Sequence, residues 1–210
     1  MAAVFDPSRC AHVGMNLWRG NLPLRSDRTF AFKELRQVLG INEEQPFIDV
    51  SVIDNVEGGE RDVWQPEMEA FGIDVEATWP TNRPDIPPQF NQEDPPWVPG
   101  VLHGDKDKVM WWQIEGGNNS IVLGPALRSY DFIGYVDRLA QLNRLGMPVY
   151  VHCMNGTDRT GASVAAFAMR VMGYTLKEAF KLADSVAAAG TMNPDYVKLV
   201  KAYAKVSGFK

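Results

Sequence analysis

The sequence of 210 residues predicts a layered α/β fold in one domain (residues 1–210), because short apolar strands alternate with helical segments. Two runs rich in β-branched residues, PFIDVSVI (residues 46–53) and PVYVH (residues 148–152), are typical of buried strands. The segment GASVAAFAMRVM (residues 161–172) is apolar on nearly all sides, which indicates a central helix packed against the sheet.

The first third of the chain contains further strands and helices in alternation. A strand-like segment ends at Pro23, and Ser26 or Asp27 is placed to cap a helix that runs to about Leu39. We expect strands at residues 16–23, 46–53 and 72–79, and a second helix at residues 61–71.

A proline-rich segment then interrupts the pattern. Residues 80–99 contain seven of the fourteen prolines, and proline lacks the N–H donor that helices and strand ladders need. We therefore expect an extended loop within an insertion at about residues 80–107. A loop of this length is either a lid or binding element or a disordered segment, and the sequence supports both interpretations equally.

After this loop the alternation resumes. A strand is expected at residues 108–114, a Gly/Asn loop at 115–120, and a helix from about 127 to 145, before the strand at 148–152. Thr175 and Glu178 form a capping box for the helix after residue 172. Asn193 and Pro194 open the last helix.

The bulk composition excludes several classes of protein. A net charge of −5 argues against a general nucleic-acid binder. The sequence has no membrane-length apolar run and no secretory signal peptide, so we expect no membrane span. Cys10 and Cys153 do not form a disulfide framework, and free thiols indicate a cytoplasmic location. A bacterial effector exported by a dedicated machine would have the same composition, and the oligomeric state is left open.

The segment HCMNGTDRTG (residues 152–161) carries the chemistry, because it lies between the last predicted strand and the buried helix. Backbone N–H groups from Met154 to Arg159 can curl into a concave nest for an anion, toward which the helix directs its positive dipole end. A cysteine at the base of such a nest is favoured as thiolate. Cys153 is therefore the candidate nucleophile.

Other residues of the segment complete a phosphate site. The planar guanidinium of Arg159 can hold two phosphate oxygens at once. The hydroxyl of Thr160 can hydrogen-bond the sulfur, and His152 is expected to orient the loop through hydrogen bonds. The expected phosphate-binding residues are Met154, Asn155, Gly156, Thr157 and Thr160.

The alternative is that Cys153 is simply a buried strand cysteine, which would be the better interpretation of an isolated cysteine. Here His, Cys, Arg, Thr and Gly stand at fixed offsets between a strand and a helix. This pattern favours the catalytic interpretation.

These residues resemble the Cys-x5-Arg signature of the protein tyrosine phosphatase superfamily, in a compact dual-specificity or atypical bacterial type. Weaker similarity covers LWRGNLP (residues 17–23), FIDVSV (residues 47–52) and FGIDVEATWP (residues 71–80). The resemblance implies a central sheet of four or five mostly parallel strands flanked by helices, a phosphocysteine intermediate, and no metal or other cofactor. A cell-cycle-type phosphatase on a rhodanese-like fold shares the spacing, but the Thr-Gly entry to an apolar helix fits it less well.

The general acid is the main departure from that family, which usually supplies an aspartate 30–40 residues before the cysteine. Residues 115–125 contain no aspartate. Asp158 is our first choice, since an Asp-Arg pair within the loop is typical of the lipid-directed branches; an ion-paired structural role is the alternative. Bacterial lipid-type members often have lysine where this chain has Thr157. The other candidates are Glu115 and Asp85, whereas Asp105 and Asp107 are expected to be solvated and Asp131 and Asp137 to be surface charges.

The substrate is less well determined. Tryptophans at 79, 97, 111 and 112 could wall a phosphotyrosine cleft, although Trp111 and Trp112 suit a core better. A phosphoinositide would require several cations near the site, but exposed Lys and Arg usually only keep a protein soluble. The available cations are Arg19, Arg25, Arg28, Lys106, Lys108 and Arg128. We rank phosphorylated proteins first, phosphoinositides second and inositol phosphates third. A pseudophosphatase that binds phosphate without turnover is the alternative of another class.

Overall fold

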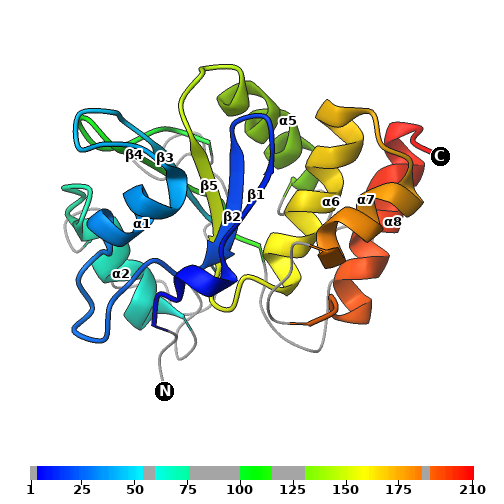
Figure 1. Ribbon diagram of the computed structural model, residues 1–210. Helices are drawn as coiled ribbons and strands as arrows, with labels where there is room; N and C mark the ends of the chain where they lie inside the picture. Colours follow the sequence, from blue (N-terminus) through cyan, green and yellow to red (C-terminus); the bar gives the residue numbers. More distant parts are fainter. Residues whose placement is uncertain (1–3, 54–59, 76–99, 115–130, 186–189) are drawn as a thin grey trace, which may run out of the picture.

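The computed structural model describes residues 4–53, 60–75, 100–114, 131–185 and 190–210. Within these residues the chain forms a five-stranded sheet in the order β1-β2-β5-β3-β4 (Figure 1). Only the edge pair β1–β2 is antiparallel; the other neighbours are parallel. The strands are β1 (Ala11–Gly14), β2 (Leu17–Asn21), β3 (Ile48–Ser51), β4 (Lys108–Trp111) and β5 (Val149–Cys153).

Helices cover both faces of the sheet and bury two separate cores (Figure 1). The first described element is a short 3-10 helix, η1 (Pro7–Arg9). The smaller helical layer consists of α1 (Phe32–Leu39) and α2 (Arg61–Glu69). The larger layer consists of α5 (Phe132–Asn143), α6 (Asp158–Met172), α7 (Leu176–Ser185) and α8 (Pro194–Ser207). The predicted α/β class, with a mostly parallel sheet flanked by helices, is therefore confirmed.

Helix α6 is the centre of the larger layer, as its apolar sequence predicts. It packs against α5, α7 and α8 and also against β5. Its residues from Arg159 to Met169 are all buried, and Gly173 ends it in the left-handed conformation with φ 75°. Because α6 directly follows β5, the loop between them is fixed by buried structure at both ends.

Four predicted strands are confirmed as β2, β3, β4 and β5, and two expectations are wrong. The first helix begins at Phe32 and not near Asp27, because the Asp27 carboxylate accepts hydrogen bonds from Thr29 and holds a turn. Residues 72–75 lie outside the sheet, after a turn in which the Ile73 N–H donates to the Met68 carbonyl (3.3 Å). The rest of that expected strand and residues 80–99 lie outside the described residues.

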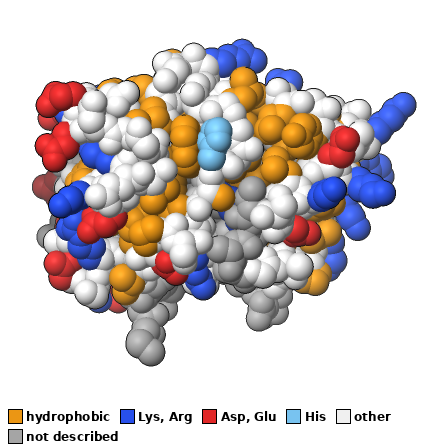
Figure 2. Space-filling model, in the orientation of Figure 1, with side chains coloured by type: hydrophobic (Ala, Val, Ile, Leu, Met, Phe, Trp, Pro, Cys, Tyr) orange, Lys and Arg blue, Asp and Glu red, His pale blue; other side chains and the backbone are white. Residues whose placement is uncertain are grey.

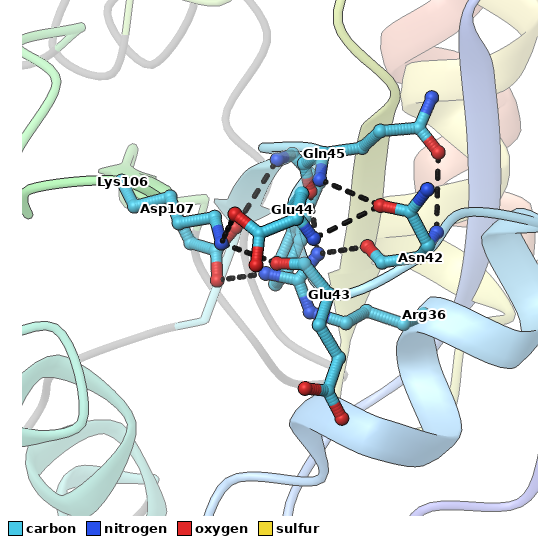
Figure 3. Close-up of polar contacts among 8 residues, drawn as sticks. Arg36, Asn42, Glu43, Glu44, Gln45, Lys106 and Asp107 are labelled. Carbon is cyan, nitrogen blue, oxygen red and sulfur yellow. Dashed lines mark hydrogen bonds and ion pairs between the residues drawn. The ribbon is translucent and has the colours of Figure 1, made fainter.

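A third expectation, a solvated Asp107, is also wrong (Figure 3). Arg36 of α1 is largely buried and donates to Asp107 Oδ2 at 2.5 Å. The same guanidinium donates to the carbonyls of Asn42 (3.0 Å) and Gln45 (2.5 Å). This network connects α1 to the segments that precede β3 and β4, so it holds the starts of these two strands against the helix.

The charges are unevenly distributed over the surface. On the face shown in Figure 2, Lys and Arg side chains gather at the edge formed by the C-terminal helices. Hydrophobic side chains lie on either side of a histidine over the β1–β2 hairpin. None of the described helices has the length and hydropathy of a membrane span.

Candidate active site

The loop between β5 and α6 forms the floor of a hollow in the protein surface. Strand β5 ends at Cys153 and α6 begins at Asp158, so only four residues connect them. Cys153 is 3% exposed and lies in the hollow. The described residues that line the hollow are Glu60, Cys153, Met154, Asn155, Asp158, Arg159, Asn193 and Tyr196.

Three carbonyl groups of this loop are held by donors from the N-terminal segment. The pairs are Leu22 N–H to Met154 O (3.3 Å), Arg9 Nη1 to Asn155 O (3.4 Å) and Arg19 Nη2 to Gly156 O. In a planar trans peptide the N–H points opposite to the C=O. Holding these carbonyls outside the loop therefore turns the next three N–H groups toward its interior, where an anion can bind.

The N-terminus of α6 adds further donors. Thr157, its N-cap residue, makes no side-chain capping hydrogen bond. The first N–H groups of a helix have no partner within it and are available to an anion. The loop and the helix therefore offer one continuous set of N–H groups.

Close packing of two backbones requires Gly156. Its φ is 73°, and a Cβ there would lie 2.5 Å from the carbonyl oxygen of Gly20 in β2. Gly20 has no room either, since a Cβ would lie 2.0 Å from the Tyr150 hydroxyl. These two glycines let β2 support the loop from behind.

Cys153 is buried, yet its pKa is lowered from the usual value of a thiol. Burial favours the neutral thiol. The charge of Arg159, the hydroxyl and N–H of Thr160 and the N–H of Gly156 together outweigh burial and lower the pKa. The site therefore favours the thiolate, which is the nucleophilic form.

Arg159 is held by a carboxylate that the sequence did not reveal. Its two terminal nitrogens donate to the two oxygens of Glu60, both at 2.5 Å. Burial alone would lower the pKa of Arg159, but the bonds to Glu60 and the charge of Cys153 raise it above its usual value. The guanidinium is thus permanently charged and fixed in the hollow.

Arg19 of β2 is a second buried guanidinium behind the loop. It has no exposed surface and donates to the carbonyls of Ala183 (2.9 Å) and Gly156. Among the described residues no carboxylate lies within ion-pair distance of it. Burial lowers its pKa to about 10, and the charge of Cys153 is the largest opposing influence. Our expectation of Arg19 as a surface cation is wrong.

Asp158 stands in the wall of the hollow at the first position of α6. Its Oδ1 accepts a hydrogen bond from the N–H of Asn193 at 2.7 Å, which orients the carboxyl group. Asn193 and Tyr196, at the start of α8, complete this wall. The other acid candidates, Asp85 and Glu115, lie outside the described residues.

The remaining expected site residues divide between core and undescribed segments. His152 is fully buried, and its Nε2 lies near two carboxylates, Asp49 and Glu67, that are far from it in the sequence. Trp111 and Trp112 are buried in the two cores, as expected. The other two candidate tryptophans and Arg128 lie outside the described residues.

Neither a protein-family model nor a curated protein matches the sequence, but solved structures are similar. Human DUSP28 superimposes with a TM-score of 0.56 at 15% identity, covering 99% of both chains. Tk-PTP in its active form gives 0.53 at 15% identity over 94% of this chain and 97% of that chain. PTPMT1 in complex with PI(5)P gives 0.52 at 10% identity over 95% and 97%.

At these identities the similarity defines the fold. The chain has the fold of the protein tyrosine phosphatase superfamily, and dual-specificity phosphatases are among its structural neighbours. The fold class that the loop motif implied is thereby confirmed, whereas the bacterial subtype stays a prediction.

Proposed function

We propose that this protein is a cysteine-dependent phosphatase that hydrolyses phosphomonoesters through a phosphocysteine intermediate. One observation carries the proposal. Cys153 lies at the base of an anion-binding loop, with a pKa that is lowered in spite of nearly complete burial. An inert core cysteine has its pKa raised by burial.

In the first step the phosphate of the substrate binds the loop N–H groups and the Arg159 guanidinium. The Cys153 thiolate attacks phosphorus and forms the S–P bond as the ester O–P bond breaks. The leaving oxygen takes a proton from Asp158. The N–H groups and Arg159 are set before reaction to hold the charge on the equatorial oxygens, which is a major source of catalysis.

In the second step water attacks the phosphocysteine and the S–P bond breaks. Asp158, now ionised, takes a proton from the water, and the products are inorganic phosphate and the Cys153 thiolate. The Thr160 hydroxyl lies beside the sulfur and lowers the pKa of Cys153, so it would stabilise the negative charge on the sulfur as it leaves. Besides the substrate and this water, the scheme uses only groups of the chain.

Asp158 is proposed as the acid because of its place in the hollow. The Asn193 N–H occupies Oδ1, which leaves Oδ2 as the atom that carries the proton. A general acid must lie within reach of the leaving oxygen, and Asp158 lines the same hollow as Cys153 and Arg159. Asp85 and Glu115 remain the alternatives.

For the substrate, we propose phosphotyrosine or dual-specificity protein substrates. The described lining holds one cation, Arg159, against two carboxylates, Glu60 and Asp158. Such a lining suits an ester with a single phosphate better than a polyphosphorylated head group. A phosphoinositide or inositol phosphate is the second candidate, and PTPMT1, whose structure was solved with PI(5)P, supports it.

A pseudophosphatase that binds phosphate without turnover is the competing proposal of another class. The lowered pKa of Cys153 and the buried, charged Arg159 beside it support the enzyme. A lasting phosphopeptide complex of the wild-type protein, without phosphate release, would favour the binding module.

The test is phosphate release by wild type, Cys153→Ser and Asp158→Asn over about pH 4.5 to 8. The substrates are an aryl phosphate, phosphotyrosine peptides and phosphoinositides, and Cys10→Ser is the control thiol variant. We expect turnover by wild type and Cys10→Ser, none by Cys153→Ser, and a changed pH profile for Asp158→Asn. Folded wild type that releases no phosphate from any substrate would overturn the enzyme proposal.

A further inference from the structure

Three fully buried titratable side chains meet on the face of the sheet covered by α1 and α2. His152 Nε2 lies 2.7 Å from Glu67 Oε1 and 3.3 Å from Asp49 Oδ1, and all three side chains have no exposed surface. The Ser51 hydroxyl donates to the other oxygen of Glu67 at 3.0 Å. Successive strand residues point to opposite faces, so this cluster lies behind the strand end that carries Cys153.

The cluster has an unbalanced charge unless it holds an extra proton or a cation. With both carboxylates ionised and His152 protonated, one net negative charge would remain in the core, where unpaired charge is costly. A zinc ion is one solution, since the three side chains offer suitable ligand atoms. Tetrahedral ligands at about 2.1 Å from zinc lie about 3.4 Å apart. The 2.7 Å between His152 Nε2 and Glu67 Oε1 is too short for two ligands of one zinc ion, and it is the distance of a close ion pair.

The surroundings of the cluster agree with an extra proton. Burial raises the pKa of Glu67 to about 7 in spite of the opposing influence of His152. Burial would lower the pKa of His152, but Glu67 and Asp49 raise it well above its usual value. Asp49 comes from β3, Glu67 from α2 and His152 from β5.

Few other titratable groups of the described chain face the cluster. Tyr150 of β5 stacks on His152 with ring centroids 5.6 Å apart. Burial raises its pKa well above the usual value, so it stays neutral. Its hydroxyl lies 3.4 Å from the sulfur of Cys10, whose pKa burial also raises. The thiolate of Cys153 lies on the opposite face.

We propose that Asp49 and Glu67 are positioning residues that form a buried cluster with His152, holding one extra proton, and thereby fix the residue before the nucleophile. Two carboxylates from different elements hold the ring, while the His152 carbonyl accepts from the Val52 N–H at 3.0 Å. Because the ring and the carbonyl of His152 are both held, the sulfur of Cys153 keeps its distance to the N–H groups of the loop. The catalytic consequence rests on the proposed phosphatase function.

The test compares Glu67→Gln and Asp49→Asn with Glu69→Gln, a control on the exposed side of the same helix. All are made in the Cys10→Ser background, which leaves Cys153 as the only thiol. The rate of alkylation by iodoacetamide is followed against pH, because the thiolate is the reactive form. The same proteins are assayed for kcat and KM on an aryl phosphate.

We expect Glu67→Gln and Asp49→Asn to raise the midpoint pH of alkylation. We expect kcat to fall roughly 10- to 100-fold, as for a displacement of about 1 Å, with KM nearly unchanged. Glu69→Gln should behave as its parent. A Glu67→Gln protein that is folded and less stable, but keeps the parental midpoint and kcat, would show that the cluster is only structural.

Two measurements on the wild-type protein do not depend on whether the variants fold. The ¹⁵N NMR titration of its histidines should show one imidazole that stays protonated well above pH 6.5; three ordinary titrations would overturn the proposal. Elemental analysis should find no stoichiometric metal. One equivalent of metal in wild type that is absent from Glu67→Gln would overturn the proposal, because the cluster would then hold a metal ion in place of the extra proton. Alkylation and NMR need no turnover, so they test the cluster even if the phosphatase proposal fails.

Discussion

Replacing Arg19 with methionine is expected to lower the activity of this protein strongly while changing its stability little. Arg19 has no exposed surface, and burial lowers its pKa from the usual value of an arginine to about 10. At about 1.4 kcal/mol per unit, keeping this guanidinium charged costs the folded state about 3 kcal/mol. Methionine, an apolar side chain of similar length, removes that cost.

The substitution also removes two hydrogen bonds. The carbonyls of Gly156 and Ala183 lose their donor, and each buried unsatisfied group costs about 1–3 kcal/mol. The free energy lost with these hydrogen bonds and the free energy gained because no charge is buried are of similar size and opposite sign. We therefore expect the free energy of unfolding of Arg19→Met to stay within about 2 kcal/mol of wild type.

Activity should respond much more strongly. Without Arg19 the peptide after Gly156 can rotate and direct its carbonyl into the loop, which replaces a donor by an acceptor. Losing one donor to a charged transition state costs about 10²–10³ in kcat. The buried positive charge that favours the Cys153 thiolate is lost as well.

The assay is kcat and KM on an aryl phosphate together with urea unfolding, with Arg170→Met as the matched control. Arg170 lies at the exposed end of α6, where it pairs with Asp137 at 2.7 Å, so its loss should leave kcat unchanged. The reasoning is refuted if Arg19→Met keeps kcat within about threefold of wild type. It is also refuted if the activity lost merely follows the fraction of unfolded protein.

Three further predictions follow from the same geometry. Glu60→Gln should bind inorganic phosphate about 3- to 10-fold more tightly, because it keeps an acceptor for Arg159 but removes a negative charge from the hollow; inhibition constants measure this, and weaker binding than wild type would contradict it. Gly156→Ala should lower kcat/KM more than 100-fold, since its Cβ would meet the Gly20 carbonyl at 2.5 Å. Gly173 has a similar φ of 75°, but nothing lies near its missing Cβ. The control Gly173→Ala should therefore lose only about 1–2 kcal/mol of stability in melting curves and keep its kinetics. Equal kinetics of the two variants would count against the tight packing of Gly156 on β2. Finally, the pKa of Glu67 is raised on folding from 4.5 to about 7, so its contribution to stability is full below pH 4.5 and is lost as the pH rises through 7. The difference in unfolding free energy between wild type and Glu67→Gln should therefore fall by on the order of 3 kcal/mol over that window, and urea titrations that give a constant difference would reject this.

The parts of the fold that the sequence predicted are those where local pattern and burial agree. Strands β3 and β5 are short, β-branched and buried along their whole length, and α6 is apolar on nearly every side. Strand β1 has only four residues at the sheet edge, with one buried side chain, so it carries no recognisable alternation. The start of α1 was misplaced because the local turn at Asp27 competes with a helix cap.

The site divides in the same way between local and tertiary information. Cys153 and Arg159 belong to one contiguous loop, whose spacing is visible in the sequence. Glu60 lines the hollow and Arg19 supports the loop from behind, and only the fold brings these two residues from other elements to the site. A lone aspartate in an apolar strand, Asp49, was the one sequence signal that could have indicated a buried polar partner for His152.

The central claim is that phosphate passes through the sulfur of Cys153. Rapid acid quenching of wild type during turnover of an aryl phosphate, followed by mass spectrometry of the peptide that contains Cys153, tests it most directly. We predict one added phosphoryl group on that peptide, with both the adduct and phosphate release lost in Cys153→Ser. Phosphate release that persists in Cys153→Ser, or an adduct on any other residue, would contradict the account.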